Sequence, residues 1–459
     1  MKKKHAAYTL MVSLVAALGG FLFGYDWVVI GGAKPFYEIY FGITDAPLMQ
    51  GWVMASAIVG CIVGVVVSGS FSDQFGRKPL MLVASIIFLI SAIGTGVVNE
   101  LYWLVAYRLL GGVGIGIASA LAPLYIAEIV PAKSRGVYVS INQLTVVLGI
   151  LMAQLVNWLI AEPTVAGEDM AISWNVNEGW RWMFWACGVP AALYIILLFF
   201  IPESPRWLTL KGNHAKATTV FTRIGGPDYA VDAVRATQHA AEKDKERIDF
   251  SYFLAPKVRK ILLIGVVIAV FQQWCGINVI FNYAQEVFEA AGYNVTDILF
   301  NIVITGATNV VFTVIGMYAV DRVGRRALMT SGAVALMCIY GLMGICYYYH
   351  VSGITVLLLV VAAIACYAMT LAPVTWVVLS EIFPTKIRGR AMAVATFSLW
   401  GACFVLTYTF PLLNTSLGAH GTFWLYGGIC FLGFLFIKSQ LPETAGKSLE
   451  EIEEAFSAR

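Results

Sequence analysis

Two charged residues, Asp26 and Arg108, lie inside long apolar segments of the sequence. Asp26 occurs in FGYDWVVIGG, residues 23–32, within an apolar segment that runs from 8 to 33. A carboxylate removed from water binds a proton more readily, whereas a nearby guanidinium favours its release. A carboxylate that alternately approaches and leaves an arginine could therefore take up and release a proton. The simpler alternative is a static ion pair that only fixes helix packing.

The expected positions of the two charges allow them to pair. The first apolar segment ends near Ala33 and the fourth begins at Leu101, so each charge lies seven residues from the same predicted face. Seven residues correspond to about 10 Å of helix at roughly 1.5 Å per residue. We therefore predict that Asp26 is the proton carrier and that Arg108 is its partner.

Neutral amide side chains form a second group of polar residues within apolar segments. They are Gln143 in the fifth segment, Gln272, Gln273, Asn278 and Asn282 in the seventh, and Asn309 in the eighth. Amides donate and accept hydrogen bonds without a charge, which suits an uncharged, polyhydroxylated ligand. Trp376 and Trp400 could stack on the C–H faces of such a ligand. The alternative is that the amides bond one another between helices without a ligand.

The elements that position these residues are predicted to be membrane-spanning helices. Of the 459 residues, 59% are hydrophobic and 12% are charged, and the mean hydropathy is +0.78. Each of twelve apolar segments is long enough to cross a hydrocarbon core of roughly 30 Å as a helix. We expect spans at 8–33, 51–72, 79–98, 101–127, 137–160, 182–201, 261–283, 298–320, 328–349, 354–380, 391–413 and 422–438. Gly276 makes the seventh a candidate for a broken helix.

The distribution of positive charge predicts the orientation. All but three of the 30 lysines and arginines fall in the tails and loops of one side, the exceptions being Lys34, Arg108 and Arg181. Since positive loops stay in the cytoplasm, we expect both termini there. The start, MKKKHAAYTL, lacks an A-x-A cleavage site, so we expect an uncleaved end. No basic stripe with aromatic spacing indicates a nucleic-acid partner.

No motif for covalent chemistry is found. The eight cysteines all fall in predicted spans without a C-x-x-C pair, and the five histidines lie in loops or tails. The glycine run GGVGIGIASA, 111–120, lacks G-x-G-x-x-G spacing and is expected to pack helices closely. We therefore expect no enzyme, no catalytic residue, no metal site and no cofactor.

Internal repeats divide the chain. SDQFGRKPL (72–80) recurs as VDRVGRRAL (320–328), and AEIVPAKSRG (127–136) recurs as SEIFPTKIRG (380–389). A weaker echo pairs PESPRWL with PETAGKS. A duplication with six spans in each half is a recurrent transporter architecture. We expect an N-terminal six-helix bundle at 1–205, cytoplasmic linker helices at 206–258, a C-terminal six-helix bundle at 259–441 and a cytoplasmic tail at 442–459.

The repeated loops are candidates for an inner gate. A glycine in each D-x-x-G-R loop can take positive φ, and the arginines can pair with acids on neighbouring helices. We expect ion-pair networks there, with Glu128 beside Arg135 and Glu381 beside Arg388, that hold the halves together. The gate residues are Asp73, Arg77, Glu128, Arg135, Asp321, Arg325, Glu381 and Arg388.

These motifs together resemble the sugar porter family of the major facilitator superfamily over essentially the whole chain. The resemblance rests on two D-x-x-G-R-[KR] loops, Y-R-L-L-G-G at 107–112, P-E-S-P-R-W-L, Q-Q-x-x-G-I-N and P-E-T-x-G-K-S-L-E-E. It is closest to the proton-coupled D-xylose branch. The fold it implies is all-α, with twelve transmembrane helices in two bundles and a helical linker.

The resemblance also implies a sugar site. Carried over by position, the sugar contacts are Gln143, Gln272, Gln273, Asn278, Asn309, Trp376 and Trp400, with Phe23 and Tyr283 nearby. The xylose branch has glutamine at the positions of Ile150 and Leu399, tyrosine at Asn282 and glycine at Ala372. The xylose branch also has an acid at the position of Asp26 and an arginine at the position of Arg108, whereas glucose facilitators have asparagine in place of the acid.

The expected function is proton-coupled symport of a monosaccharide, a pentose or hexose of the D-xylose or D-glucose type, by alternating access. The expected partners are the sugar, the proton and the lipid bilayer of a bacterial inner membrane, and the protein is expected to act as a monomer. One alternative is an uncoupled facilitative uniporter of the same fold. Another is a sugar sensor, for which a longer cytoplasmic tail than 442–459 would be expected.

Overall fold

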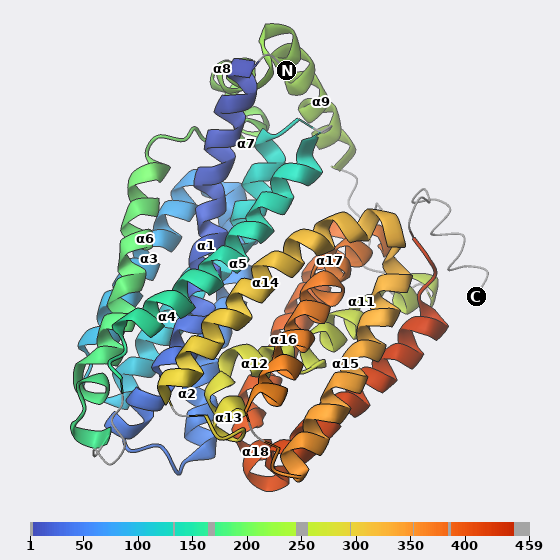
Figure 1. The fold of residues 1–459 in the computed structure, drawn as a ribbon. Coiled ribbons are helices and arrows are strands. Elements are labelled where there is room, and N and C mark those ends of the chain that lie inside the picture. The colour runs from blue at the N-terminus through green and yellow to red at the C-terminus, as the bar shows by residue number, and fades with distance from the viewer. Residues whose placement is uncertain are drawn as a thin grey trace. The chain divides into compact units, whose positions relative to one another are not determined.

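The structure is a computed structural model that describes residues 3–131, 134–163, 170–244, 256–293, 295–351, 353–383 and 387–444. Within these residues every regular element is a helix (Figure 1). Eleven helices in this part of the chain are long and apolar enough to cross a membrane. The chain is therefore an all-helical, multi-pass membrane protein, as its composition predicts.

The longest helix, α18 (Arg388–Gln440), explains why eleven helices are found where twelve spans are expected. It has 53 residues, or about 80 Å at roughly 1.5 Å per residue, which is more than twice the thickness of a hydrocarbon core. The backbone is not helical at Gly418, where φ is 66° and ψ is 171°. This helix therefore contains two membrane-length segments, which agree with the spans predicted at 391–413 and 422–438.

One compact unit of the chain comprises Met1–Val29, Ser56–Val156 and Trp180–Arg247. Its elements are α1 (Lys3–Tyr40) up to Val29, α2 (Pro47–Phe75) from Ser56, α3 (Arg77–Val97), α4 (Leu101–Ile129), α5 (Arg135–Ile160) up to Val156, α6 (Trp180–Leu198), α7 (Pro205–Leu210), α8 (His214–Gly225) and α9 (Pro227–Asp244). We call it the first unit.

The second unit comprises Ile30–Ala55, Asn157–Gly179 and Ile248–Arg459. Besides the ends of α1, α2 and α5 it contains η2 (Met170–Ile172), η3 (Asn175–Gly179), α11 (Pro256–Trp274), α12 (Ile277–Asn282), α13 (Ala284–Glu289), α14 (Val295–Val323), α15 (Arg325–Tyr348), α16 (Ile354–Met369), α17 (Leu371–Ile382) and α18. Three helices thus contribute to both units. The division into two six-helix bundles at 205 and 259 stays a prediction.

The glycine run on α4 packs this helix against α2, as predicted. A Cβ added to Gly112 would lie 2.0 Å from the carbonyl oxygen of Ala57, and one added to Gly116 would lie 2.2 Å from that of Cys61. No side chain fits at those distances. The two backbones therefore approach closely only because glycine occupies these positions, a common way of packing helices in membranes.

The seventh predicted span is broken at Gly276, also as predicted. This residue lies between α11 and α12 and has a φ of 87°, in the left-handed region that favours glycine. A second departure from helical geometry follows at Tyr283, where φ is −124° and ψ is 32° between α12 and α13. Polar residues near the first break are thereby held in positions that a regular helix would not give them.

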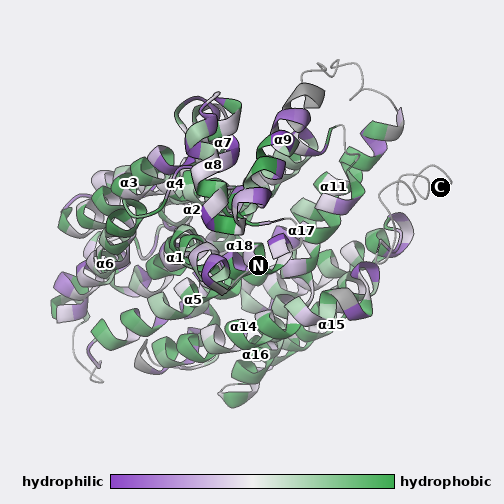
Figure 2. Ribbon diagram, turned by 90° about the horizontal axis from the view of Figure 1, so that it is seen from above, coloured by the Kyte–Doolittle hydropathy of each residue, from purple (hydrophilic) through white to green (hydrophobic). Residues whose placement is uncertain are grey.

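The predicted linker is helical in its described part. α7, α8 and α9 cover most of 205–244, and one face of α8 buries Ala217, Val220, Phe221 and Ile224. Figure 2 shows hydrophilic residues along α9, in contrast to the mainly hydrophobic long helices. Residues 245–255 and the tail from 445 lie outside the described residues.

The two halves of the duplication build the same local structure. The glycines of the D-x-x-G-R loops have positive φ, 103° at Gly76 and 96° at Gly324. Glu203 accepts hydrogen bonds from the backbone N–H groups of Arg77 and Lys78 at the start of α3. Glu443 accepts from the corresponding N–H groups of Arg325 and Arg326 at the start of α15. The weak sequence echo PES/PET therefore marks a repeated cap.

Each cap places a carboxylate at a helix N-terminus, where the exposed N–H groups and the helix dipole favour negative charge. Burial raises the pKa of the Glu203 carboxyl, and hydrogen bonds from the backbone of Ser204, Lys78 and Arg77 oppose that rise. The three N–H donors thus offset part of the cost of keeping this carboxylate away from water.

We predict that Glu203→Ala lowers thermal stability, because it leaves the first N–H groups of α3 without an acceptor. Loss of a helix cap costs about 1 kcal/mol, which corresponds to roughly 2–4 °C in the melting temperature of a domain of 150–250 residues. Thermal unfolding in detergent measures the shift. Glu100→Ala is the matched control, since Glu100 precedes α4 without capping it. Equal melting temperatures for the two variants would contradict the capping role.

Candidate functional site

The charged pair predicted from the sequence is present in the first unit. Nη1 of Arg108 on α4 donates a 2.7 Å hydrogen bond to Oδ1 of Asp26 on α1. Both side chains are buried, with exposed fractions of 3% for Arg108 and 8% for Asp26. The prediction that the two side chains pair is confirmed.

The pair is held by one hydrogen bond rather than by two. Oδ2 of Asp26 and Nε of Arg108 are buried without a hydrogen-bond partner in the described part of the chain. The guanidinium carbon lies 5.9 Å from the centroid of the Phe184 ring, within the range of a cation–π contact. One carboxylate oxygen is therefore available to a proton, and the aromatic ring can help to stabilise Arg108 when the carboxyl is neutral.

Three predicted amides form a continuous hydrogen-bonded chain in the second unit. Nδ2 of Asn278 donates to Oε1 of Gln273, and Nε2 of Gln273 donates over 2.6 Å to Oε1 of Gln272. Nε2 of Gln272 donates over 2.6 Å to the hydroxyl of Tyr367 on α16. All four side chains are buried. We call these four residues the amide chain.

The helix break at Gly276 explains how the amide chain forms. Side chains meet along a regular helix when they are three or four residues apart. Gln273 and Asn278 are five apart, and the break between them allows their side chains to bond directly. The sequence indicates the break and the amides, but not Tyr367, which is a single tyrosine within an otherwise apolar span.

The other predicted ligand contacts lie on several helices. Asn309 on α14 and Trp400 on α18 are buried, whereas Trp376 on α17 is exposed. Gln143 on α5 and Phe23 on α1 are partly exposed and belong to the first unit.

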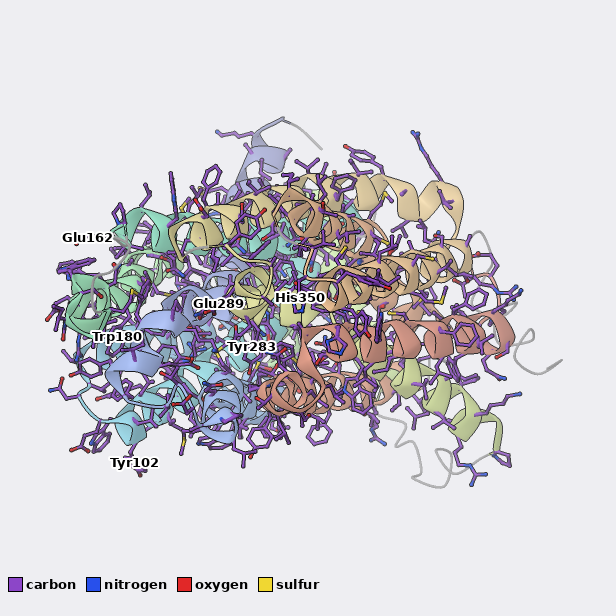
Figure 3. The ribbon with its side chains drawn as sticks, turned by 60° about the horizontal axis from the view of Figure 1, so that its bottom comes forward. Tyr102, Glu162, Trp180, Tyr283, Glu289 and His350 are labelled. Atoms are coloured by element: carbon purple, nitrogen blue, oxygen red, sulfur yellow. The ribbon has the colours of Figure 1, made fainter. Side chains whose placement is uncertain are left out.

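Tyr283 has a structural hydrogen bond of its own. Its ring is fully buried at the start of α13, and its hydroxyl donates to the carbonyl oxygen of Thr407 over 2.6 Å. Figure 3 labels Tyr283 and Glu289, which lie at the two ends of this short helix. Since its proton is already engaged, this hydroxyl can offer a ligand only an acceptor.

In each half the arginine of the D-x-x-G-R loop pairs with a glutamate. Nε of Arg77 donates to Oε2 of Glu128, and Nη2 of Arg77 donates to Oε1, both over 3.0 Å. Both side chains are buried. Nη2 of Arg325 lies 3.2 Å from Oε1 of Glu381 at the corresponding place. Asp73 also pairs with Arg77 at 3.2 Å but is largely exposed. The side chain of Asp321 lies outside the described residues.

Two expected pairings are wrong. Glu128 does not pair with Arg135, which is exposed at the start of α5. Glu381 does not pair with Arg388, whose Nε donates to the carbonyl oxygen of Phe383 over 3.3 Å. In both halves the arginine that follows the loop glycine, at the first position of the next helix, pairs with the carboxylate instead.

Sequence reasoning missed further buried charges. Arg181 on α6 donates to the carbonyl oxygens of Gly96 and Val98, at 2.9 and 2.7 Å. It thereby gives a hydrogen-bond donor to carbonyl groups that the end of α3 leaves without one. Lys34 and Glu38 are buried on α1, which continues to Tyr40 instead of ending near 33. Their i, i+4 spacing is the signal that could have predicted this extension.

Comparison with known proteins agrees with this architecture. The family described as "Sugar (and other) transporter" matches residues 12–456. The arabinose-proton symporter of Bacillus subtilis is 36% identical over 97% of this chain and 94% of its own length. The D-xylose-proton symporter of Escherichia coli K12 is 36% identical over 98% of this chain and 96% of its own.

Structural similarity extends over the same length. The partially occluded inward open structure of the xylose transporter XylE from E. coli superimposes with a TM-score of 0.85, at 35% identity, over 96% of this chain and 100% of XylE. Another relative is named for facilitated diffusion and not for proton symport. This protein, the glucose facilitated diffusion protein of Zymomonas mobilis, is 32% identical over 98% of this chain and 97% of its own length.

Family and fold therefore agree with the expectation from the motifs. The matched family consists of transport proteins and not of enzymes. This chain belongs to the sugar transporter family, the sugar porters of the major facilitator superfamily.

Proposed function

We propose that this protein is a proton-coupled monosaccharide symporter that works by alternating access. The observation that carries the proposal is the buried ion pair between Asp26 and Arg108, with one carboxylate oxygen left without a partner. Two relatives at 36% identity are named as proton symporters of arabinose and xylose. Proton binding to Asp26 would remove its attraction for Arg108 and so change the free energy of any motion that separates α1 from α4.

The proposed substrate is a pentose or hexose bound through uncharged polar contacts. The amide chain offers donors and acceptors without a formal charge, as a polyhydroxylated ligand requires. We assign the remaining sugar contacts to Gln143, Asn309, Trp376, Trp400 and Phe23, on the strength of their place in the family pattern and not of any bound ligand.

We further propose that the inner ion pairs belong to a gate on the cytoplasmic side of a bacterial inner membrane, where both termini would lie. Glu128 with Arg77 and Glu381 with Arg325 brace equivalent loops of the two halves. Arg135 and Arg388 remain candidates for contacts in another conformation. We expect the protein to work as a monomer.

The central prediction is that Asp26→Asn abolishes proton-driven accumulation while sugar counterflow is retained, because asparagine cannot exchange a proton. Uptake of labelled D-xylose, L-arabinose, D-glucose and D-galactose into proteoliposomes, with and without an imposed proton gradient, measures the effect. The exposed Asp45→Asn serves as the control.

Two results would contradict proton coupling. One is concentrative uptake that persists in Asp26→Asn. The other is wild-type uptake that ignores pH and protonophore, which would support the uncoupled facilitator, the mode named for the Zymomonas relative.

A second prediction concerns the amide chain. Gln273→Ala and Asn278→Ala should each weaken sugar binding roughly 10- to 100-fold, since an unpaired hydroxyl or amide costs about 1–3 kcal/mol. Calorimetric titration of purified variants gives the affinity, and size-exclusion profiles verify folding. The exposed Gln238→Ala on α9 is the control. Wild-type affinity in both amide variants would rule out this site.

A further inference from the structure

A buried group of three charged residues lies apart from the Asp26 pair, in the second unit. Nζ of Lys34 is 2.9 Å from both oxygens of Glu38 and 2.5 Å from Oε1 of Glu286. The side chains of Lys34 and Glu38 are 3% and 6% exposed, and that of Glu286 is 19% exposed. We call these three residues the triad. It joins the end of α1 to α13.

The charges of the triad do not balance. One ammonium group faces two carboxylates, so full ionisation would bury one excess negative charge. In the described part of the chain no other lysine or arginine forms an ion pair with either carboxylate. An uncompensated buried charge is costly, and a group in that position commonly becomes neutral instead.

The surroundings do not supply the missing positive charge. Glu289, at the end of α13, adds a further negative charge. The hydroxyl of Tyr37 on α1 is bonded to Sδ of Met54, and that of Tyr283 to a backbone carbonyl. The Tyr283 ring lies 5.7 Å from Nζ of Lys34 and stabilises only the cation.

Each acid keeps an oxygen that can take a proton. Oε2 of Glu286 is buried and accepts no hydrogen bond within the described residues, and Oε1 of Glu38, also buried, lies 2.9 Å from Nζ of Lys34 without the geometry of a hydrogen bond. A proton on either oxygen would neutralise the excess charge. Since Glu286 is the more exposed of the two acids, water can deliver the proton from its side.

We propose that the triad is a second proton-binding site, in which Glu38 and Glu286 together hold one proton while α1 and α13 are in contact. The proton comes from water and is returned to it unchanged. When the contact breaks, Lys34 keeps Glu38 as its i, i+4 partner, Glu286 meets water, and both acids ionise. Acid therefore favours the contact between α1 and α13. The consequence for transport, a pH-dependent closing contact, rests on the proposed transport function.

Infrared difference spectroscopy of the full-length protein tests this site directly. The carbonyl stretching band of protonated carboxyl groups is measured across a pH titration in an Asp26→Asn background, which removes the other proposed proton site. We expect one protonated carboxyl at neutral pH, lost in Glu38→Gln and in Glu286→Gln. Glu289→Gln, on the exposed end of α13, should keep it.

A third variant is expected to raise the number of protonated carboxyl groups instead of lowering it. Lys34→Met removes the only cation of the triad, so we expect the number of protonated carboxyls to rise from one to two. An unchanged band in both glutamine variants, or no increase in Lys34→Met, would overturn the proposal. The readout does not involve sugar or transport. Its failure is therefore distinguishable from a failure of proton coupling at Asp26, which only the uptake experiments detect.

Discussion

The cost of charge in a low-dielectric interior governs the polar structure of this protein. An unpaired ion buried away from water costs several kcal/mol or more, so each buried charge must find a partner or become neutral. Asp26 with Arg108, and Glu128 with Arg77, satisfy this condition, and Arg77 also pairs with the largely exposed Asp73. The difference between them lies in how many bonds each pair makes.

That difference separates structural pairs from a pair that can change. Arg77 engages both oxygens of Glu128, which also accepts from Ser204, so its geometry is fixed by several bonds. Arg108 makes one bond to Asp26 and has an aromatic ring as its other neighbour. A bidentate pair is stronger and more exact in orientation than a single bond. The pair of Asp26 and Arg108 is therefore held by fewer directed contacts than the pair of Glu128 and Arg77, as the proposed role of Asp26 requires.

Sequence reasoning succeeded where a single helix or a repeat carried the information. The spans, the break at Gly276 and the pairing of Asp26 with Arg108 follow from local composition and helix rise. The partners of Glu128 and Glu381 could not be found in this way, because they depend on how helices are rotated about their axes and on which neighbours they meet. The repeated loops indicate that ion pairs form there, but leave several arginines as equivalent candidates.

The first helix shows a different limit. Ending it before Lys34 follows the rule that membrane spans contain few ions, yet the helix continues to Tyr40 with Lys34 and Glu38 buried. The rule fails here because Glu286, about 250 residues later in the sequence, supplies a second partner for the lysine. A hydropathy profile contains no information on such a distant contact.

The amide chain adds a constraint on selectivity. Because Asn278, Gln273 and Gln272 already bond one another, a sugar at the proposed site would exchange hydrogen bonds with them and would not simply add new ones. The net gain per exchanged bond is about 0.5–1.5 kcal/mol, whereas a hydroxyl buried against an apolar side chain loses about 1–3 kcal/mol. Ile150 and Leu399 are both buried, and the sequence resemblance to the xylose branch implies glutamine at these two positions there. Discrimination among sugars would then depend less on the shared amides than on which hydroxyls these two apolar side chains leave unpaired.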